Sequence, residues 1–412
     1  MLFPLPVPSV LHRTLRFREQ SPAIRRSASR RHGKQIRFGL YLADLSHGRT
    51  SSHGIVNYAL GLTVALLSGL RGDERLVLFV NQEVLEALGA LVGSACLAVA
   101  AEVHILQAPR NRVERLWMDH ATSLLLAVGD GLDVMHFPKG FIPILNPTRA
   151  KIVATVHDDI PCRYIERTWG SAHVSRQDRY FAWALRHAVR HADHLLTVSE
   201  FSRGCLEMRQ GRTRRGPPIS VTHEGVTLPT RAFVPVAKRN PHILHIGSRF
   251  PHKRSLWGIS TLLRHLDETG MQLRLRILGD LDDEAERLAV HPRVDRVRKS
   301  LSNEDIATEM AHARALIFPS EYEGFGLPPV EALCLGTPAI YARTAATAEV
   351  LRGIPGGYDS TDEQSFREAF NEALRSSDED LQRLQSRLRD RYSWEKVGQQ
   401  TLEVYRSLAS RT

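Results

Sequence analysis

The sequence predicts an α/β protein built from two domains. Short apolar segments typical of buried strands alternate with longer segments of helical periodicity, a pattern that favours parallel sheets covered by helices. The chain has 412 residues, the size of two ordinary domains. Residues 229–240 hold two prolines and three basic residues, a composition typical of a linker.

The first predicted domain covers residues 35–228. Its strand candidates are residues 36–42, 76–80, 103–106, 134–137, 152–156, 195–198 and 219–226. A helix is predicted to open at Gly54. Another follows Ser199, because serine is a favoured residue immediately before a helix.

The second predicted domain covers residues 241–390, and an amphipathic helix is predicted within residues 391–412. Its strand candidates begin at His242 and include residues 274–278, 315–318 and 338–341. The helix candidate that starts near Ser302 carries Asp305 three residues later, a looser form of the capping box.

Composition favours a globular, reduced protein. Hydrophobic residues make up 42% and charged residues 24% of the chain, which are ordinary globular values. No apolar run reaches the roughly 18–20 residues of a membrane span. Four cysteines are scattered without CxxC spacing (Cys96, Cys162, Cys205 and Cys334), so we expect free thiols in a cytoplasmic protein.

The basic charge is concentrated in residues 1–34. This segment has eight Lys/Arg and one acid, which accounts for +7 of the net charge of +10. The remainder is nearly balanced, so a nucleic-acid-binding body is not indicated. The segment is predicted to be a disordered basic tail. A passive tail is the favoured interpretation. Peripheral contact with the anionic inner face of a membrane and a transit peptide are the alternatives.

The most informative segment runs from Glu323 to Glu331, with the sequence Glu-Gly-Phe-Gly-Leu-Pro-Pro-Val-Glu. It follows a predicted strand, and its two prolines suit the first turn of a helix. Loop amides and a helix N-terminus favour an anion, whereas carboxylates accept hydrogen bonds from hydroxyls. Together these features predict a ligand with phosphates between hydroxyl-rich groups, such as a sugar nucleotide.

This segment resembles the Glu-x7-Glu motif of the family-four retaining glycosyltransferases. The resemblance implies the GT-B fold, in which two Rossmann-like domains face a central cleft. The resemblance implies that Glu323 contacts the donor sugar and Glu331 holds the nucleotide ribose. It also implies that the intervening loop binds the donor through Gly324, Phe325, Gly326 and Leu327. In the family the closing segment crosses back, so we expect residues 391–412 to lie against the N-terminal domain.

A second segment, residues 242–254, has a strand pattern followed by a glycine turn and basic residues. Cations after such a turn are well placed to bind a diphosphate. The segment resembles the family's Gly-x-Arg-x-x-x-Lys loop, which implies that Arg249 and Lys253 bind the donor phosphates. Arg254 stands where the family often has Asn or Gly.

Residues of the first domain complete the expected site. A histidine at a strand end points into the crevice where α/β proteins bind ligands, and His157 resembles the family histidine that approaches the donor sugar. Gly54 occupies the place of the family's N-terminal glycine loop, although many members have two glycines there. Asp158, Arg163 and Lys139 are candidates for the acceptor side.

No metal or other cofactor is expected. Asp280 and Asp282 form an Asp-x-Asp sequence, but their position before a predicted helix favours an acidic cap. Arg249, Lys253 and helix N-termini are expected to stabilise a departing diphosphate without a metal.

The resemblance implies a metal-independent, retaining hexosyltransferase that acts on a glycan or lipid-linked glycan acceptor. The His-Asp-Asp-Ile-Pro sequence at residues 157–161 resembles the polysaccharide-assembly mannosyltransferase branch, so GDP-mannose is the first choice of donor. A UDP-glucose-type donor is the alternative. Rival functions are a GT-B sugar-nucleotide epimerase and a non-catalytic protein that uses the basic tail.

Overall fold

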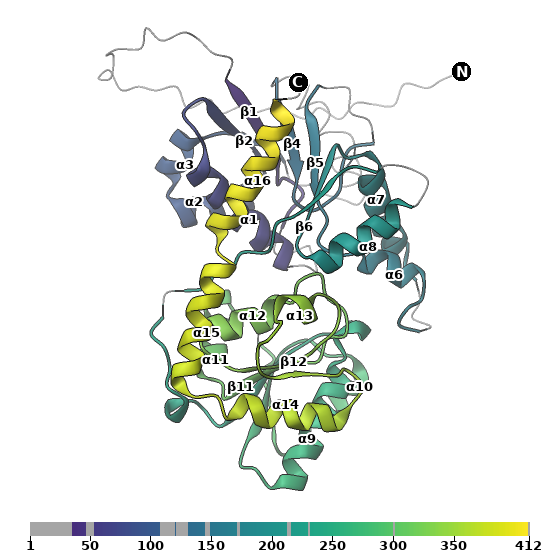
Figure 1. The fold of residues 1–412 in the computed structure, drawn as a ribbon, viewed down its shortest axis with the longest axis vertical. Coiled ribbons are helices and arrows are strands. Elements are labelled where there is room, and N and C mark those ends of the chain that lie inside the picture. The colour runs from purple at the N-terminus through teal and green to yellow at the C-terminus, as the bar shows by residue number, and fades with distance from the viewer. Residues whose placement is uncertain are drawn as a thin grey trace.

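The computed structural model describes residues 35–46, 53–107, 120, 131–144, 149–170, 174–211, 216–229, 231–299 and 301–410. Two α/β units lie one above the other along the long axis of the molecule (Figure 1). Each is built on a parallel sheet, so the predicted fold class is confirmed. The predicted tail, residues 1–34, lies outside the described residues.

The sheet of the first unit has the strand order β3-β2-β1-β4-β5-β6-β7 in the described residues. Its strands are β1 (Ile36–Tyr41), β2 (Glu74–Val80), β3 (Ala101–Ile105), β4 (Val134–Phe137), β5 (Lys151–Thr155), β6 (His194–Thr197) and β7 (Ile219–Val221). The order reverses between β1 and β4. Open α/β sheets bind ligands at such a switch point, outside the carboxyl ends of the strands.

Helices cover both faces of this sheet. They are α1 (His53–Gly69), α2 (Gln82–Val92), α3 (Ser94–Ala100), α6 (Ile160–Ile165), α7 (Arg176–His191) and α8 (Glu200–Gln210). Side chains of β2 alternate between the faces: Leu76 and Leu78 pack on the side of α1 and α2, and Val77 and Phe79 on the side of α7. Burial on both faces explains the continuous apolar strands in the sequence.

The sheet of the second unit has the order β10-β9-β8-β11-β12-β13 in the described residues. Its strands are β8 (His242–Gly247), β9 (Arg274–Gly279), β10 (Val294–Arg296), β11 (Ala315–Phe318), β12 (Ala339–Ala342) and β13 (Gly357–Tyr358). The order reverses between β8 and β11, so the two segments that the sequence analysis singled out leave neighbouring strands at the same sheet edge.

The helices of the second unit are α9 (Ser255–Thr269), α10 (Asp283–Leu288), α11 (Asn303–His312), α12 (Leu327–Cys334), α13 (Ala345–Val350) and α14 (Glu363–Leu374). Short 3-10 turns lie at η2 (Val236–Lys238) and η3 (Pro251–Lys253). The predicted caps are confirmed: Ser199 caps α8, and Ser302 with Asp305 forms a capping box on α11.

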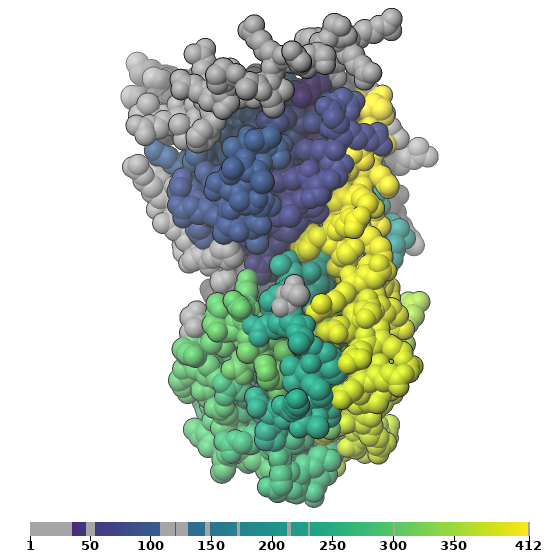
Figure 2. Space-filling model, turned by 90° about the vertical axis from the view of Figure 1, so that its left-hand side faces the viewer, coloured from purple at the N-terminus to yellow at the C-terminus, as the bar shows by residue number. Residues whose placement is uncertain are grey.

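Two helices at the end of the chain run along both units (Figure 2). The first, α15 (Asp378–Arg391), packs on α12, and the second, α16 (Trp394–Ala409), packs on α1 and β4. Trp394 lies against Gly61 and Gly225, where an added Cβ would come within 2.2 and 2.3 Å of its ring. These two glycines therefore allow α16 to approach the first unit closely.

Among the described residues, no single helix is long and apolar enough to cross a membrane. The pair α2 and α3 reaches that length and composition together, but it is bent by 103°.

Candidate active site

Lys253 and Glu323 meet at the carboxyl edge of the second sheet. Lys253 ends the η3 turn after β8, and Glu323 follows β11, which pairs with β8. The Lys253 Nζ lies 2.6 Å from Glu323 Oε1, and both side chains are largely buried. The switch point between two strands thus brings together two residues that lie 70 positions apart in the sequence.

The loop after Glu323 opens helix α12 as the sequence predicts. Gly326 precedes the helix with φ 92°, a left-handed conformation that favours glycine, and prolines occupy the first turn. No side chain caps the helix start. The Leu327 amide therefore stays available to an anion, whereas Pro328 and Pro329 have no N–H.

Glu331 is the fifth residue of α12, so it lies just beyond the first helical turn, although the segment's prolines lead us to expect it within that turn. The helix begins at Leu327, and 3.6 residues complete a turn. Burial, together with the charge of Glu224, raises the pKa of Glu331 to about 7. Among the described residues its carboxylate has no hydrogen-bond partner, which leaves it available to ligand hydroxyls.

The loop of the second unit contacts the first unit at Gly324. An added Cβ there would lie 2.2 Å from the carbonyl oxygen of His157, so this approach requires glycine. The Ser199 hydroxyl, at the start of α8, donates a hydrogen bond to the Gly324 carbonyl at 2.6 Å. Glu323 and His157 therefore border the same boundary between the units.

His157 follows β5, and both of its ring nitrogens face acceptors. Nδ1 lies 3.1 Å from Glu224 Oε1, and Nε2 lies 3.1 Å from the Pro138 carbonyl oxygen. A carbonyl and a carboxylate can only accept, so this geometry favours a doubly protonated ring. Burial lowers the pKa of His157, but the hydrogen bond and charge of Glu224 outweigh burial, and the pKa lies above its ordinary value.

Sequence reasoning missed Glu224. From the sequence, this residue is predicted only as part of the strand candidate at residues 219–226, but Glu224 is buried and its carboxylate contacts the His157 ring. It follows β7, whose carboxyl end lies at the same sheet edge as that of β5. A charged residue followed by glycine just beyond a strand candidate is the signal that could have identified it.

Asp158 shares this part of the cleft. Burial, with the charges of Asp159 and Glu323, raises its pKa to about 6, although the Ile160 amide and His157 act in the opposite direction. Its Oδ1 accepts a hydrogen bond from the Ile160 amide at 2.9 Å. Of the three acceptor-side candidates, Asp158 is the one whose charged group lies near the donor-side residues His157 and Glu323.

The other two acceptor-side candidates have carboxylate partners within the protein. Lys139 lies 2.9 Å from Asp44 in a largely buried ion pair at the switch point of the first sheet. Arg163 lies 2.9 Å from Asp159 and 4.2 Å above the ring of Tyr322. The structure therefore places Arg163 at the contact between the two units.

Arg249 does not meet the Lys253–Glu323 pair. Its side chain is 70% exposed and lies 3.7 Å from Asp280, so the two predicted phosphate-binding cations have different partners. Gly54 is in the first turn of α1, and an added Cβ would meet nothing within 4 Å.

A further set of contacts joins the two units beside the site. The Tyr322 hydroxyl donates to Asp159, which also accepts from Arg209 at 2.8 Å. The carboxylate of Glu349, on α13, accepts from the first two backbone amides of α8 at 2.9 and 2.8 Å. These partners come from distant parts of the sequence, so no local pattern predicted them.

Within the described residues, no group of three or more His, Cys, Asp or Glu side chains could hold a metal ion. Asp282 accepts hydrogen bonds from the amides of Glu284 and Ala285 at 3.1 and 2.8 Å. The predicted acidic cap is confirmed, since these bonds start α10.

Comparisons with known proteins agree with this architecture. Residues 230–391 match the family model described as glycosyl transferases group 1. The chain is 25% identical over 239 residues to the O-antigen chain mannosyltransferase RfbU of Salmonella typhimurium, covering 53% of this chain and 64% of that protein. It is 25% identical over 382 residues to the O-antigen chain mannosyltransferase B of Escherichia coli, covering 86% and 96%.

The fold is shared with a sucrose-phosphate synthase from Thermosynechococcus elongatus, with a TM-score of 0.65, 16% identity, and coverage of 92% of this chain and all of that one. The chain spans less than two thirds of the length of the Salmonella relative, and 28% and 31% of two relatives with higher local identity. Fold and site define a protein of the GT-B class. More closely, residues 230–391 match the group 1 glycosyl transferases, and the chain resembles relatives named as mannosyltransferases.

Proposed function

We propose that this protein is a retaining hexosyltransferase that moves mannose from GDP-mannose to a glycan or lipid-linked glycan acceptor. The observation that carries the proposal is the Lys253–Glu323 pair, which lies at a sheet switch point beside the uncapped start of α12 and near His157. The relatives named as mannosyltransferases support mannose as the sugar. A UDP-glucose-type donor is the alternative with the same chemistry.

The proposed donor site uses the described residues in distinct roles. Lys253 and the amides from Gly324 to Leu327 bind the diphosphate, because a helix start and a nearby cation both favour negative charge. Glu331 accepts hydrogen bonds from the ribose hydroxyls. When the diphosphate attracts Lys253, Glu323 becomes available to the hydroxyls of the donor sugar. Arg249 reaches the phosphates by a movement of its exposed side chain.

In the proposed reaction the bond from the sugar C1 to the diphosphate oxygen breaks, and a bond from C1 to the acceptor oxygen forms on the same face. The acceptor proton passes to the departing phosphate oxygen. Lys253 and the positively charged His157 stabilise the developing negative charge, so no metal ion is required. Closure of the two units excludes water and orients the acceptor hydroxyl. The proposed place of action is the cytoplasmic face of a membrane that carries the acceptor.

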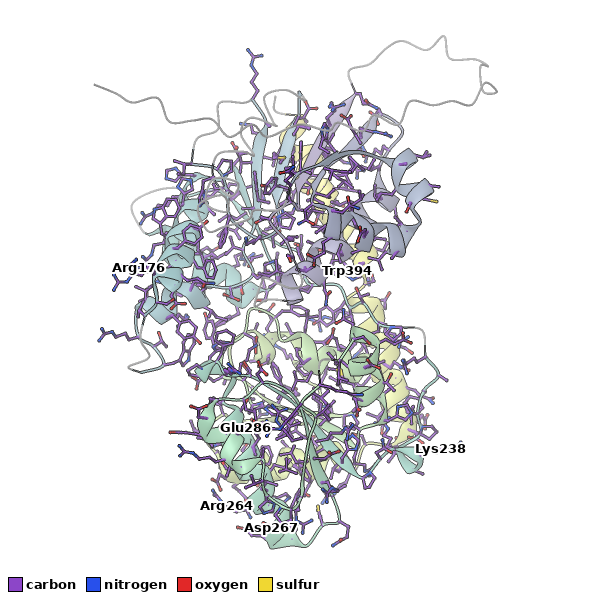
Figure 3. All side chains as sticks on the ribbon, turned by 180° about the vertical axis from the view of Figure 1, so that it is seen from behind. Arg176, Lys238, Arg264, Asp267, Glu286 and Trp394 are labelled. Carbon is purple, nitrogen blue, oxygen red and sulfur yellow. The ribbon has the colours of Figure 1, made fainter. Side chains whose placement is uncertain are left out.

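Thermal unfolding with GDP-, UDP- and ADP-sugars, in the absence of metal, tests the donor site. Binding to the folded state raises the unfolding temperature by mass action. We expect GDP-mannose to stabilise the wild type and to lose at least about tenfold in affinity for Lys253→Ala, since one charge-assisted contact contributes about 1.5–3 kcal/mol. Lys238→Ala is the matched control, because Lys238 is exposed on the same unit, away from the cleft (Figure 3).

Transfer of labelled sugar to an acceptor extract then separates the possibilities. Label in an acceptor supports transfer, whereas free epimer of the donor supports an epimerase. Equal stabilisation of the wild type and Lys253→Ala by the same nucleotide sugar would refute the assigned phosphate site.

A further inference from the structure

Helix α7 carries a row of arginines around one tryptophan. The members of this row are Arg176, Arg179, Trp183, Arg186 and Arg190. Their spacing of three, four, three and four residues places them on one face of the helix. We call this set the α7 stripe.

The stripe faces away from the protein core. The opposite face of α7 packs on the first sheet through Ala182, Leu185, Ala188 and Val189. In the stripe, Arg176, Arg179 and Arg190 are exposed, Arg186 is partly exposed, and Trp183 is 43% exposed. Figure 1 shows α7 on the outside of the first unit, and Figure 3 labels Arg176 on that outer side.

The four arginines of the stripe make no ion pairs within the described residues, although the charge of Arg186 acts on the carboxylate of Glu166. Asp178 is the acidic residue of α7, and its carboxylate is held by the Ser175 amide and hydroxyl at 2.8 and 2.6 Å in a capping box. In the second unit, by contrast, Arg264, Arg276 and Arg293 all have carboxylate partners.

Trp183 is part of an aromatic surface. Its ring stacks on that of His187 with centroids 5.5 Å apart and planes 10° apart, and it lies 6.2 Å from Tyr180. Ile144, which is 53% exposed, is close by, because its amide donates to the His120 carbonyl and the His120 ring lies 5.1 Å from that of Trp183. Single exposed apolar residues are common, but these two lie beside unpaired cations.

We propose that the α7 stripe is a docking surface for an anionic lipid bilayer, with α7 parallel to the membrane and Trp183 at the level of the headgroups. Guanidinium groups bind phosphates in a bidentate manner, and tryptophan prefers the interface between water and lipid. Basic helices with an apolar centre bind such interfaces. The surface is one convex helix, which suits a plane better than the groove that follows a nucleic-acid backbone.

The docking surface does not depend on the transfer reaction. None of its residues touches the Lys253–Glu323 pair, so vesicle binding and nucleotide binding are separate measurements. Failure of one assignment leaves the other standing.

Sedimentation of the full chain with phosphatidylcholine vesicles, with and without about 30% phosphatidylglycerol, tests the inference. The test variant replaces Arg176, Arg179 and Arg190 with glutamine. We expect its partition onto anionic vesicles to fall about 100-fold, because each of the three cations near an anionic surface contributes about fivefold. The control variant replaces the exposed Arg287, Arg352 and Arg375 with glutamine, which removes the same charge from the second unit.

Two further variants make the result specific. Lysine at the three test positions keeps the charge and should retain most of the binding, which separates loss of charge from loss of folding. Trp183→Ala should weaken binding several-fold even at high salt, where electrostatic attraction is screened.

Equal losses in the test and control variants, or no loss in either, would overturn the proposal, because binding would then come from net charge or from residues 1–34. A Trp183→Ala variant that binds vesicles normally, together with a test variant that loses binding to duplex DNA at the same salt concentration, would assign the stripe to nucleic acid instead.

Discussion

At the scale of single residues, the charge on His157 depends on Glu224. Replacing Glu224 with glutamine keeps a carbonyl oxygen that can accept from Nδ1 but removes the negative charge. Burial and the neighbouring His136 both lower the pKa of His157, and without the charge of Glu224 the raising effect of Asp158 offsets them only in part. The pKa of His157 should therefore fall. Its charged form is lost on the alkaline side, so we expect the alkaline limb of kcat/KM to move down by about one pH unit.

The measurement is the pH profile of kcat/KM together with the NMR titration of the His157 ring. Glu403→Gln, on the exposed side of α16, is the control. An unchanged alkaline limb in Glu224→Gln would show that Glu224 only fills space.

The partly buried carboxyl group of Glu331 lowers the free energy of unfolding at neutral pH, and the proposed donor site uses the same group to bind ligand. Its pKa of about 7 exceeds the ordinary value, so the folded state holds a proton that the unfolded state has released, and the wild type loses stability as pH rises from about 4.5 to 7. Glu331→Gln removes this loss. After discounting for partial exposure, we expect the free energy of unfolding of Glu331→Gln to exceed that of the wild type by about 1–2 kcal/mol at pH 8. At pH 5 the two should differ little.

Urea unfolding at both pH values measures this difference. The same variant should bind the nucleotide sugar more weakly, because it loses an acceptor for the ribose hydroxyls. A stability change that is identical at pH 5 and pH 8 would contradict the assigned titration.

At this scale, the sequence predicted residues that belong to local motifs. Glu323, Glu331 and Lys253 follow strand ends in segments with characteristic glycines, and the switch point of the second sheet brings Glu323 and Lys253 into contact. The glycine after Glu224 is a local signal, but the partner of Glu224 could not be predicted, because the pairing with His157 spans 67 residues. The partners of Arg163 and Lys139 also come from tertiary packing, which spacing alone does not reveal.

At the scale of elements, the turn from β11 into α12 requires glycine. Gly326 has φ 92°, and an added Cβ would lie 2.8 Å from the Cγ2 atom of Thr347. Gly326→Ala should cost about 1–2 kcal/mol from the backbone conformation, with a further cost from the contact. Because the same turn presents the proposed phosphate-binding amides, nucleotide binding should weaken as well.

Gly353→Ala is the matched control, since Gly353 has φ 72° and open space around it. It should show the conformational cost on thermal unfolding without the loss in binding. A Gly326→Ala variant that binds like the control would remove the turn from the donor site.

The long strands were predicted because burial on both faces gives continuous apolar runs. The strands β10 and β13 were not predicted, since three and two residues carry no usable pattern. The candidate at residues 219–226 is shorter in the structure, because β7 ends at Val221 and the chain then turns to place Glu224 beside His157.

At the scale of the whole molecule, Glu349 forms hydrogen bonds between the two units. Its carboxylate bonds to the amides of Glu200 and Phe201 at the start of α8, where a helix favours negative charge. Gly324 and Ser199 make a second contact beside it. The arrangement of the units thus rests on these polar contacts together with an apolar cluster that extends through both units.

Glu349→Ala should therefore favour separated units. Two charge-assisted hydrogen bonds in a partly exposed place contribute about 1–2 kcal/mol, so the population with the units in contact should fall by about tenfold. If chemistry requires that contact, kcat/KM should fall by a similar factor, and the radius of gyration from X-ray scattering should increase in the absence of donor.

Arg352→Ala, on the exposed surface just beyond α13, is the control for local disturbance. An unchanged radius with an unchanged kcat/KM would show that Glu349 does not set the arrangement of the units. A larger radius with full activity would show instead that donor binding alone supplies the free energy of closure.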